Sequence, residues 1–199
     1  MLPFVPWTRP PVSTALPAWL AALRRGDVAG LEVAYRQEGE AVYRYALALS
    51  GDAALAADVT QEAFVALAQS PERFDPQRGT LGAYLAGIAR HALLAAWRLR
   101  DRHLPLDDAF DDEGPAPADT AAGTDAELIG RQSVAALWEA IRALPWPFRE
   151  ALVLVDLQER PYADAARIAG VELNTLRTRV HRARQRLALA LGAGPRSLP

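Results

Sequence analysis

A long stretch without hydrophobic periodicity, from His103 to Gly123, divides this 199-residue chain into two parts. It contains three prolines and two glycines, and it is too long for an ordinary loop inside a compact domain. Helical hydrophobic periodicity occurs on both sides of it, whereas the alternation typical of strands is absent. We therefore expect an all-α protein made of two small helical bundles joined by a flexible acidic linker, the C-terminal bundle containing a helix-turn-helix.

The domain boundaries follow from the same pattern. Residues 1–17 contain five prolines and are expected to form a flexible arm. The bundles are predicted at residues 18–102 and 125–191, with a linker at 103–124 and a short tail at 192–199. No basic cluster followed by an apolar core marks a secretory signal, and no apolar run approaches the roughly 20 residues that span a bilayer. We expect a cytoplasmic protein without membrane insertion.

Several kinds of chemistry find no support in the composition. The chain has no cysteine, which excludes disulfides, thiolate metal sites and a cysteine nucleophile. His91, His103 and His181 are scattered without metal-ligand spacing. No nucleophile is paired with a base, and no phosphate-binding loop is present. We expect no catalytic residues, no metal and no cofactor.

Charge is strongly segregated, although the formal net charge is only −2. Between Asp101 and Thr124 seven acidic residues oppose only Arg102, whereas from Arg160 to the end eight arginines oppose Asp164 and Glu172. Such segregation usually reflects binding partners rather than the fold.

The segment Leu173–Leu191 contains five arginines and no acidic residue. Its apolar residues recur at helical spacing, and the opposite side is polar: Asn174, Thr175, Arg177, Thr178, His181, Arg182 and Gln185. Gly170 precedes it, with Ala166 and Leu176 at the small and core positions of a helix-turn-helix. Short polar groups and arginines on a second helix are suited to base edges and phosphates. The alternative is a solvated arginine-rich helix packed on a bundle.

Two predicted N-terminal helices also carry polar faces. The first begins after Asp52, a suitable N-cap, and buries Ala56, Thr60, Ala63 and Leu67 while exposing Asp58, Glu62, Val65 and Gln69, with Gln61 at the edge. The second, ending near Arg102, has an apolar face that includes Leu81, Leu85, Ile88 and Leu99. An earlier helix, Val28–Ser50, has a stripe that includes Leu31, Tyr35, Val42 and Leu49.

A further stripe on the second of these helices combines an aromatic ring, an imidazole and two guanidiniums. Tyr84, His91, Arg98 and Arg102 lie within about 40° of one line. Such a stripe suits stacking on unpaired bases and contact with phosphate. The alternatives remain open: a core tyrosine beside surface arginines here, and an ordinary solvated face around Asp58.

The segment Ala143–Leu191 resembles region 4 of bacterial sigma factors, with Leu-Pro, then Arg-Glu before an apolar run, and the ending Thr178-Arg179-Val180-His181-Arg182-Ala183-Arg184. The resemblance implies contacts to the −35 promoter element by Asn174, Thr175, Arg177, Thr178, Arg179, His181, Arg182 and Arg186. Ala165 stands where family members usually have a larger aliphatic residue, and Asn174-Thr175 stands where they usually have Gly-Thr.

The segment Asp58-Val59-Thr60-Gln61-Glu62-Ala63-Phe64 resembles the region 2 helix of sigma factors. This implies that Asp58, Gln61 and Glu62 contact the clamp helices of the polymerase β′ subunit. The residues from Arg73 to Arg90 resemble the part of region 2 that opens the −10 element, which implies a −10 surface of Arg78, Tyr84, His91, Arg98 and Arg102. Family members often have Trp and Asn where Tyr84 and His91 stand.

The domain that larger sigma factors carry between regions 2 and 4 is missing, so the chain resembles the extracytoplasmic-function (ECF) group. The resemblance implies an alternative sigma factor whose partners are core RNA polymerase, through the β′ clamp helices and the β subunit, promoter DNA and an anti-sigma factor. A different class of function is a stand-alone helix-turn-helix regulator whose N-terminal bundle senses a ligand or dimerises. An enzyme would be a third class of function.

Overall fold

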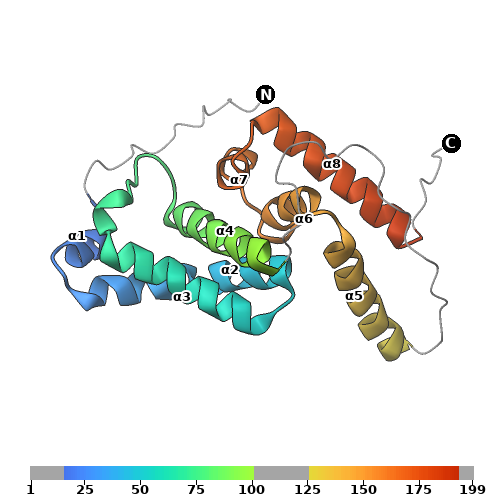
Figure 1. Ribbon diagram of the computed structural model, residues 1–199, viewed down its shortest axis with the longest axis horizontal. Helices are drawn as coiled ribbons and strands as arrows, with labels where there is room; N and C mark the ends of the chain where they lie inside the picture. The colour runs from blue at the N-terminus through green and yellow to red at the C-terminus, as the bar shows by residue number, and fades with distance from the viewer. Residues whose placement is uncertain (1–15, 101–125, 193–199) are drawn as a thin grey trace, which may run out of the picture.

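The computed structural model describes residues 16–100 and 126–192, and within these ranges it contains helices and no strand. The N-terminal bundle consists of α1 (Ala18–Arg24), α2 (Val28–Ser50), α3 (Ala53–Gln69), the 3₁₀ turn η1 (Pro71–Arg73) and α4 (Leu81–Arg100). The C-terminal bundle consists of α5 (Ala126–Ala143), α6 (Trp146–Leu152), the π-helical segment η2 (Val153–Leu157), α7 (Tyr162–Ala169) and α8 (Leu173–Ala190) (Figure 1). None of the described helices combines the length and apolarity needed to cross a membrane.

Local sequence signals define the start of α2 and of α3. The Asp27 carboxylate accepts a hydrogen bond from the Ala29 amide at 2.9 Å, at the start of α2. Asp52 does the same for α3, accepting from the amides of Ala54 and Leu55 at 3.0 and 3.1 Å. These bonds satisfy amides that have no partner within the first helical turn. The predicted N-cap at Asp52 is confirmed.

The predicted faces of α3 are also confirmed. Ala56, Thr60, Ala63 and Leu67 are buried, while Asp58, Gln61 and Glu62 are exposed. Two predicted core positions elsewhere are wrong. Tyr35 is 55% exposed although its ring meets that of Phe64 edge to face, and Leu99 is 84% exposed because it lies in the last turn of α4 at the margin of the bundle.

The C-terminal bundle has a small core of its own between α5, α6 and α8. Ile141, Leu144, Phe148, Leu152 and Ala183 form it, with Leu137, Trp138 and Leu187 packed at its edge. The helical winding changes from α6 to the π-helical segment η2 at Val153. Residues 1–15 of the predicted arm 1–17, the whole predicted linker 103–124 and residues 193–199 of the predicted tail 192–199 lie outside the described residues.

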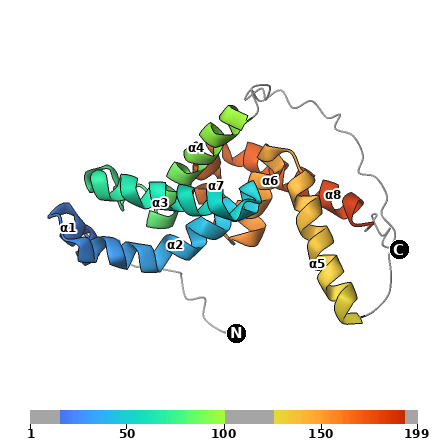
Figure 2. The same cartoon turned by 60° about the horizontal axis from the view of Figure 1, so that its bottom comes forward.

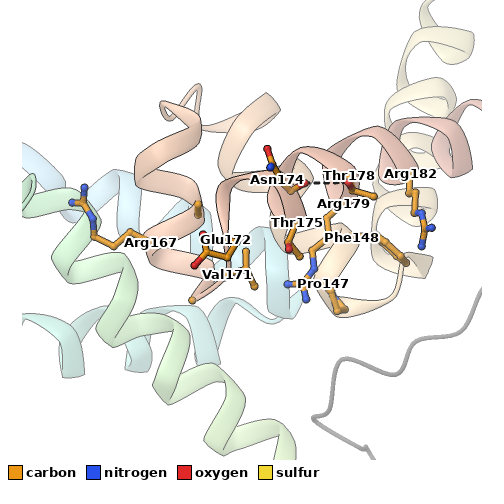
Figure 3. Close-up of a pocket in the computed structure, with 12 residues that line it drawn as sticks. Pro147, Phe148, Arg167, Val171, Glu172, Asn174, Thr175, Thr178, Arg179 and Arg182 are labelled. Carbon is orange, nitrogen blue, oxygen red and sulfur yellow. Dashed lines mark hydrogen bonds between the residues drawn. The ribbon is translucent and has the colours of Figure 1, made fainter.

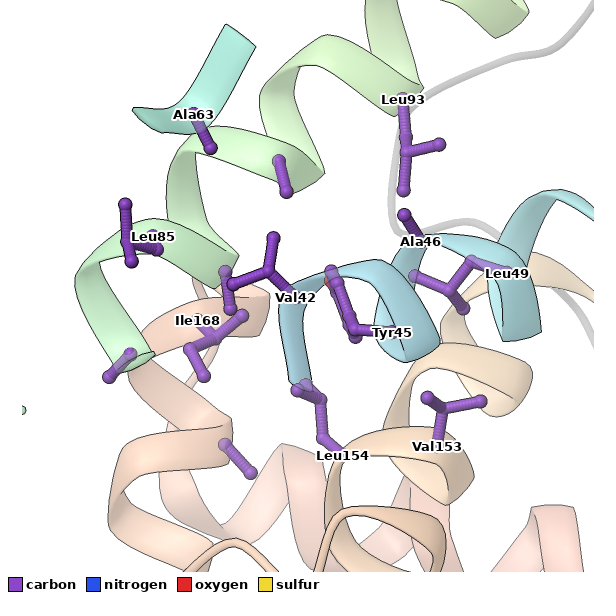
Figure 4. Packing of buried hydrophobic residues seen from close by; sticks show 14 of the residues in the cluster. Val42, Tyr45, Ala46, Leu49, Ala63, Leu85, Leu93, Val153, Leu154 and Ile168 are labelled. Atoms are coloured by element: carbon purple, nitrogen blue, oxygen red, sulfur yellow. The ribbon is translucent and has the colours of Figure 1, made fainter. Parts of the chain in front are cut away.

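The two bundles pack directly against each other. A single hydrophobic cluster includes Val42, Leu85 and Leu93 of the N-terminal bundle together with Val153, Leu154 and Ile168 of the C-terminal bundle. Figure 4 shows α2 between α4 on one side and η2 and α7 on the other, with Tyr45 next to Leu154. In Figure 2, α7 lies behind α4, against which it packs, while α5 extends away from the N-terminal bundle. The sequence did not predict this shared core.

Two glycine substitutions provide a test of the backbone. Gly170 has φ +68°, and a Cβ built there would have no neighbouring atom within 4 Å. A Cβ on Gly87, inside α4, would also have no neighbouring atom within 4 Å. Gly170→Ala should therefore lower the free energy of unfolding by about 1–2 kcal/mol through backbone strain alone. Gly87→Ala, the matched control, should raise it by about 0.5–1 kcal/mol, because alanine favours a helix. Chemical denaturation measures both, and effects of the same sign would contradict the assigned turn.

Candidate nucleic-acid interface

Helices α7 and α8 form a helix-turn-helix around Gly170. Gly170 adopts the left-handed conformation (φ +68°, ψ 35°), and the next amide, of Val171, donates to the Ala166 carbonyl at 3.0 Å. This closure ends α7 and starts the turn into α8. Leu176, Val180 and Ala183 of α8 are buried, as their spacing predicted. Ala165 is fully buried beneath the turn, so the smaller residue is packed there without exposure.

A hollow of about 930 Å³ lies along one side of α8. Helix α8 lines it with Asn174, Thr175, Thr178, Arg179 and Arg182, and α6 contributes Pro147 and Phe148 (Figure 3). The Thr178 hydroxyl donates to the Asn174 carbonyl at 3.0 Å, which is ordinary back-bonding within a helix. Five of the eight residues predicted for the −35 element therefore share one concave surface, which we call the α8 groove.

The other three predicted residues lie outside the α8 groove. Arg177 is exposed, and its guanidinium donates to the Asn174 side-chain oxygen at 3.2 Å. His181 is exposed as well. Arg186 places its guanidinium carbon 4.7 Å from the centre of the Phe148 ring, a cation–π distance. Arg177 is thus held next to the start of α8, whereas Arg186 packs on α6.

Arg184 of α8 binds a carboxylate of η2. Arg184 forms two hydrogen bonds with the Asp156 carboxylate, at 3.0 and 2.6 Å. These bonds raise the pKa of the Arg184 guanidinium above its ordinary value. A fork-shaped pair of this kind fixes the orientation of both groups. Arg184 therefore connects α8 to η2, which is consistent with its absence from the residues predicted to contact DNA.

A second hollow, of about 620 Å³, lies beside α4 and is called the α4 cavity here. Arg78, Tyr84 and His91 line it, as expected if the predicted −10 residues act together. Arg98 is exposed and is not among the lining residues, and Arg102 lies outside the described residues.

Tyr84 has a packing contact on one side and lines the α4 cavity. Its ring packs at 5.4 Å from the ring of Phe74 and is half-buried, yet it also reaches the α4 cavity. Burial raises the pKa of the Tyr84 hydroxyl, while the charge of Arg73 opposes this. Tyr84 thus has both a packing contact and a surface that a base could stack on.

Sequence reasoning missed part of the α4 cavity wall. Arg73, Asp75 and Thr80 come from the loop before α4, and Arg167 and Ile168 come from α7 of the other bundle. The Arg167 guanidinium donates to the Arg78 carbonyl at 2.8 Å. Nothing in the sequence indicated that Arg167 and Arg78, which are 89 positions apart, would be in contact. For Arg73, Asp75 and Thr80 the available signal was their place in the Arg73–Arg90 segment, and for Arg167 it was the basic charge in the first helix of the helix-turn-helix.

The residues predicted to contact polymerase, two acids and one amide, lie on α3 and line neither hollow. Asp58, Gln61 and Glu62 are exposed and follow one another at three- and one-residue steps. Because Asp58 and Glu62 are one helical turn apart, their carboxylates project from the same side. The three residues form a compact acidic face, which we call the α3 face.

Comparison with known proteins identifies both bundles. The family Sigma-70 region 2 matches residues 34–103, and Sigma-70, region 4 matches residues 135–187. The ECF RNA polymerase sigma factor SigE of Mycolicibacterium smegmatis is 35% identical over 161 residues, which cover 76% of this chain and 58% of SigE. The ECF RNA polymerase sigma factor EcfG of Rhodopseudomonas palustris is 34% identical over 147 residues, 74% of this chain and 77% of EcfG.

A solved structure supports the fold. The sigma factor RpoE from Bartonella quintana, in complex with the anti-sigma factor NepR, matches with a TM-score of 0.60 at 24% identity. The match covers 87% of this chain and 99% of that one. At this identity the likeness concerns the fold alone. The paired region 2 and region 4 matches and the relatives show that the chain belongs to the ECF group of sigma factors, alternative sigma factors that direct transcription initiation by RNA polymerase.

Proposed function

We propose that this sigma factor acts by binding alone, with separate surfaces for polymerase, the −10 element and the −35 element, and catalyses no reaction. The observation that carries the proposal is that α8 has two different sides. One side buries Leu176, Val180 and Ala183, and the polar side contains no acidic residue. Such a surface approaches a polyanion without like-charge repulsion.

The direct test is reconstitution. The protein is mixed with core polymerase and genomic DNA fragments, and the run-off transcripts are sequenced. We expect defined start sites preceded by shared −10 and −35 sequences. Transcripts indistinguishable from those of core polymerase alone would overturn the proposal.

The proposed division of labour follows the two bundles. Residues 18–102 bind core polymerase and the −10 element, residues 125–191 bind the −35 duplex, and the acidic segment 103–124 sets the spacing between them. The proposal assigns no function to the arm 1–17 or to the tail 192–199. Since RNA polymerase works in the cytoplasm, the protein acts there.

The proposed partners are core polymerase, through the β′ clamp helices and the β subunit, promoter DNA and an anti-sigma factor. The RpoE structure from Bartonella quintana contains the anti-sigma factor NepR, and the shared fold supports a comparable partner for this chain. A stand-alone regulator is not favoured, because the region 2 match covers residues 34–103, which such a regulator would use for sensing or dimerisation.

The α3 face gives a prediction for polymerase binding. Reversing Asp58 and Glu62 to Arg should abolish holoenzyme assembly, because these carboxylates would meet arginines of the polymerase. Both residues are exposed, so helical content should not change. The matched control reverses Glu139 and Glu159, two exposed acids of the C-terminal bundle, with the same change in net charge. Size-exclusion binding to core polymerase measures the effect, and wild-type affinity of the first variant would exclude the α3 face.

The α4 cavity gives a prediction for promoter opening. The double variant Tyr84→Ala, His91→Ala should form closed complexes but lose permanganate-reactive open ones, since base–aromatic stacking is worth about 1–3 kcal/mol per base. Tyr84→Phe is the control, because it keeps the ring that packs on Phe74. Unchanged opening in the double variant would leave Tyr84 as a packing residue only.

The α8 residues give a prediction that separates specificity from general affinity. Arg177→Ala should cost about 1–3 kcal/mol at the native −35 sequence and relax base preference, because Arg177 lies near the N-terminal end of α8. Arg182→Ala should weaken all sequences equally and reduce the salt slope by about 1, as expected for a phosphate contact. Arg184→Ala removes the same charge from a residue bound to Asp156 and should change the base preference least.

Titrations of native and scrambled −35 duplexes at several salt concentrations test all three variants. If Arg177→Ala and Arg182→Ala changed specificity and salt slope identically, the assigned orientation of α8 on DNA would be wrong.

A further inference from the structure

Helix α4 has a glycine in the middle of the side that lines the α4 cavity. Gly87 lies three residues after Tyr84 and four residues before His91, and all three line the α4 cavity. Residues at these spacings share one side of a helix. A Cβ built on Gly87 would have no neighbouring atom within 4 Å. A side chain at position 87 would therefore project into the α4 cavity between Tyr84 and His91.

Neither the backbone nor the packing requires a glycine at this position. Gly87 lies inside α4 and does not have a positive φ. Gly30 of α2 is different, because a Cβ there would overlap the Trp19 carbonyl oxygen of α1. Glycine inside a helix lowers the stability of the helix relative to alanine. Since Gly87 does not stabilise α4, we ask what the open space beside it can hold.

The surroundings of this space suit the base of a nucleotide. The α4 residues Ala83, Gly87 and Ile88 give the cavity an apolar floor. The ring of Tyr84, which lies 5.4 Å from the ring of Phe74, adds a flat aromatic surface. Proteins bind unpaired bases by stacking them on aromatic side chains within positively charged grooves.

Two guanidiniums of the same cavity suit the phosphate. Arg73 and Arg78 line the α4 cavity from the loop before α4, and both are exposed. The charge of Arg73 acts to lower the pKa of the Tyr84 hydroxyl, against the larger effect of burial, so Arg73 lies near that hydroxyl. The Asp75 carboxylate, which also lines the cavity, accepts a hydrogen bond from the Gln77 amide at 2.9 Å. Arginine side chains bind phosphate through several donors in one plane.

The cavity is open and is built mainly by one bundle. Arg78 and His91 are exposed, so solvent reaches the α4 cavity between the helix and its preceding loop. Only Arg167 and Ile168 among the lining residues come from the C-terminal bundle. The floor and the Tyr84 ring therefore stay together whatever the position of α7. The volume of about 620 Å³ lies within the range of roughly 300–1,000 Å³ that is usual for small-molecule pockets.

We propose that Gly87 is a specificity-determining residue of this sigma factor, because the absence of a side chain there opens the α4 cavity to one unpaired base of the −10 strand. That base lies over Gly87 against the ring of Tyr84, and its phosphate lies at Arg73 and Arg78. The inference rests on the proposed −10 function of the α4 cavity. It adds a steric requirement at a position that the family resemblance did not single out.

Filling the space tests the steric requirement. Gly87→Leu and Gly87→Gln introduce an apolar and a polar side chain that both favour a helix, so chemical denaturation should show at least wild-type stability. Holoenzyme containing either variant should bind the single-stranded −10 oligonucleotide of a run-off promoter roughly tenfold more weakly, as expected when the stacking of one base is lost. Wild-type affinity in both variants would overturn the proposal. Ala95→Leu, at an exposed position of α4 that does not line the cavity, is the matched control and should keep wild-type affinity.

Oligonucleotides that lack one base at a time separate exclusion of a base from general damage. Wild-type holoenzyme should bind more weakly when any base that it contacts is missing. In Gly87→Leu holoenzyme, the missing base should cease to matter at one position, because the leucine has already excluded that base. The other positions should keep their wild-type cost. If every position kept that cost in Gly87→Leu, the loss of affinity would be general and the proposal would be overturned.

The same measurements distinguish the inference from the function on which it rests. A wild-type holoenzyme that bound the −10 strand and a scrambled strand equally would refute the proposed −10 function, and the role of Gly87 with it. A selective wild-type holoenzyme together with filled variants of unchanged affinity would overturn the role of Gly87 alone.

Discussion

The relative position of the two bundles depends on the burial of Glu150. A carboxylate without solvent is strongly unfavourable unless donors replace the lost water, and here Tyr45 and Arg90 do so at Oε1, while the buried Oε2 has no hydrogen-bond partner among the described residues. These donors have fixed positions on α2 and α4, so α6 packs favourably in one place only. Purely apolar surfaces would tolerate sliding, because the hydrophobic effect has no direction. The directional bonds select one register for the shared core.

That register determines which binding surfaces are accessible together. The α3 face lies on the exposed side of its helix, and the polar side of α8 faces away from the buried residues Leu176 and Val180. Only the α4 cavity has walls from both bundles.

Periodicity predicted the helices well and the contacts between bundles not at all. Ala56, Ala63, Leu176 and Val180 are buried as their spacing requires, because a three- and four-residue repeat determines one face of a helix. The same rule failed at Tyr35 and Leu99, since a stripe does not reveal where the neighbouring helix ends. Glu150 could not be assigned to the core from sequence, because a carboxylate is buried only when its partners come into reach. Its partner Tyr45 is 105 positions away.

The exclusive use of arginine as the basic residue has structural consequences that charge counting misses. Arg149 donates to the carbonyls of Leu49 and Leu144, and Arg167 to that of Arg78, while Arg184 binds Asp156 through two nitrogens. A guanidinium presents several donors in a planar fork, which a lysine ammonium does not. Several arginines therefore join loops and helix ends instead of facing DNA. The number of arginines from Arg160 onward therefore overstates the number of guanidiniums that are available to bind phosphate. The hydrogen bonds that each arginine makes within the protein, more than its place in the basic segment, decide which arginines are suited to read a promoter.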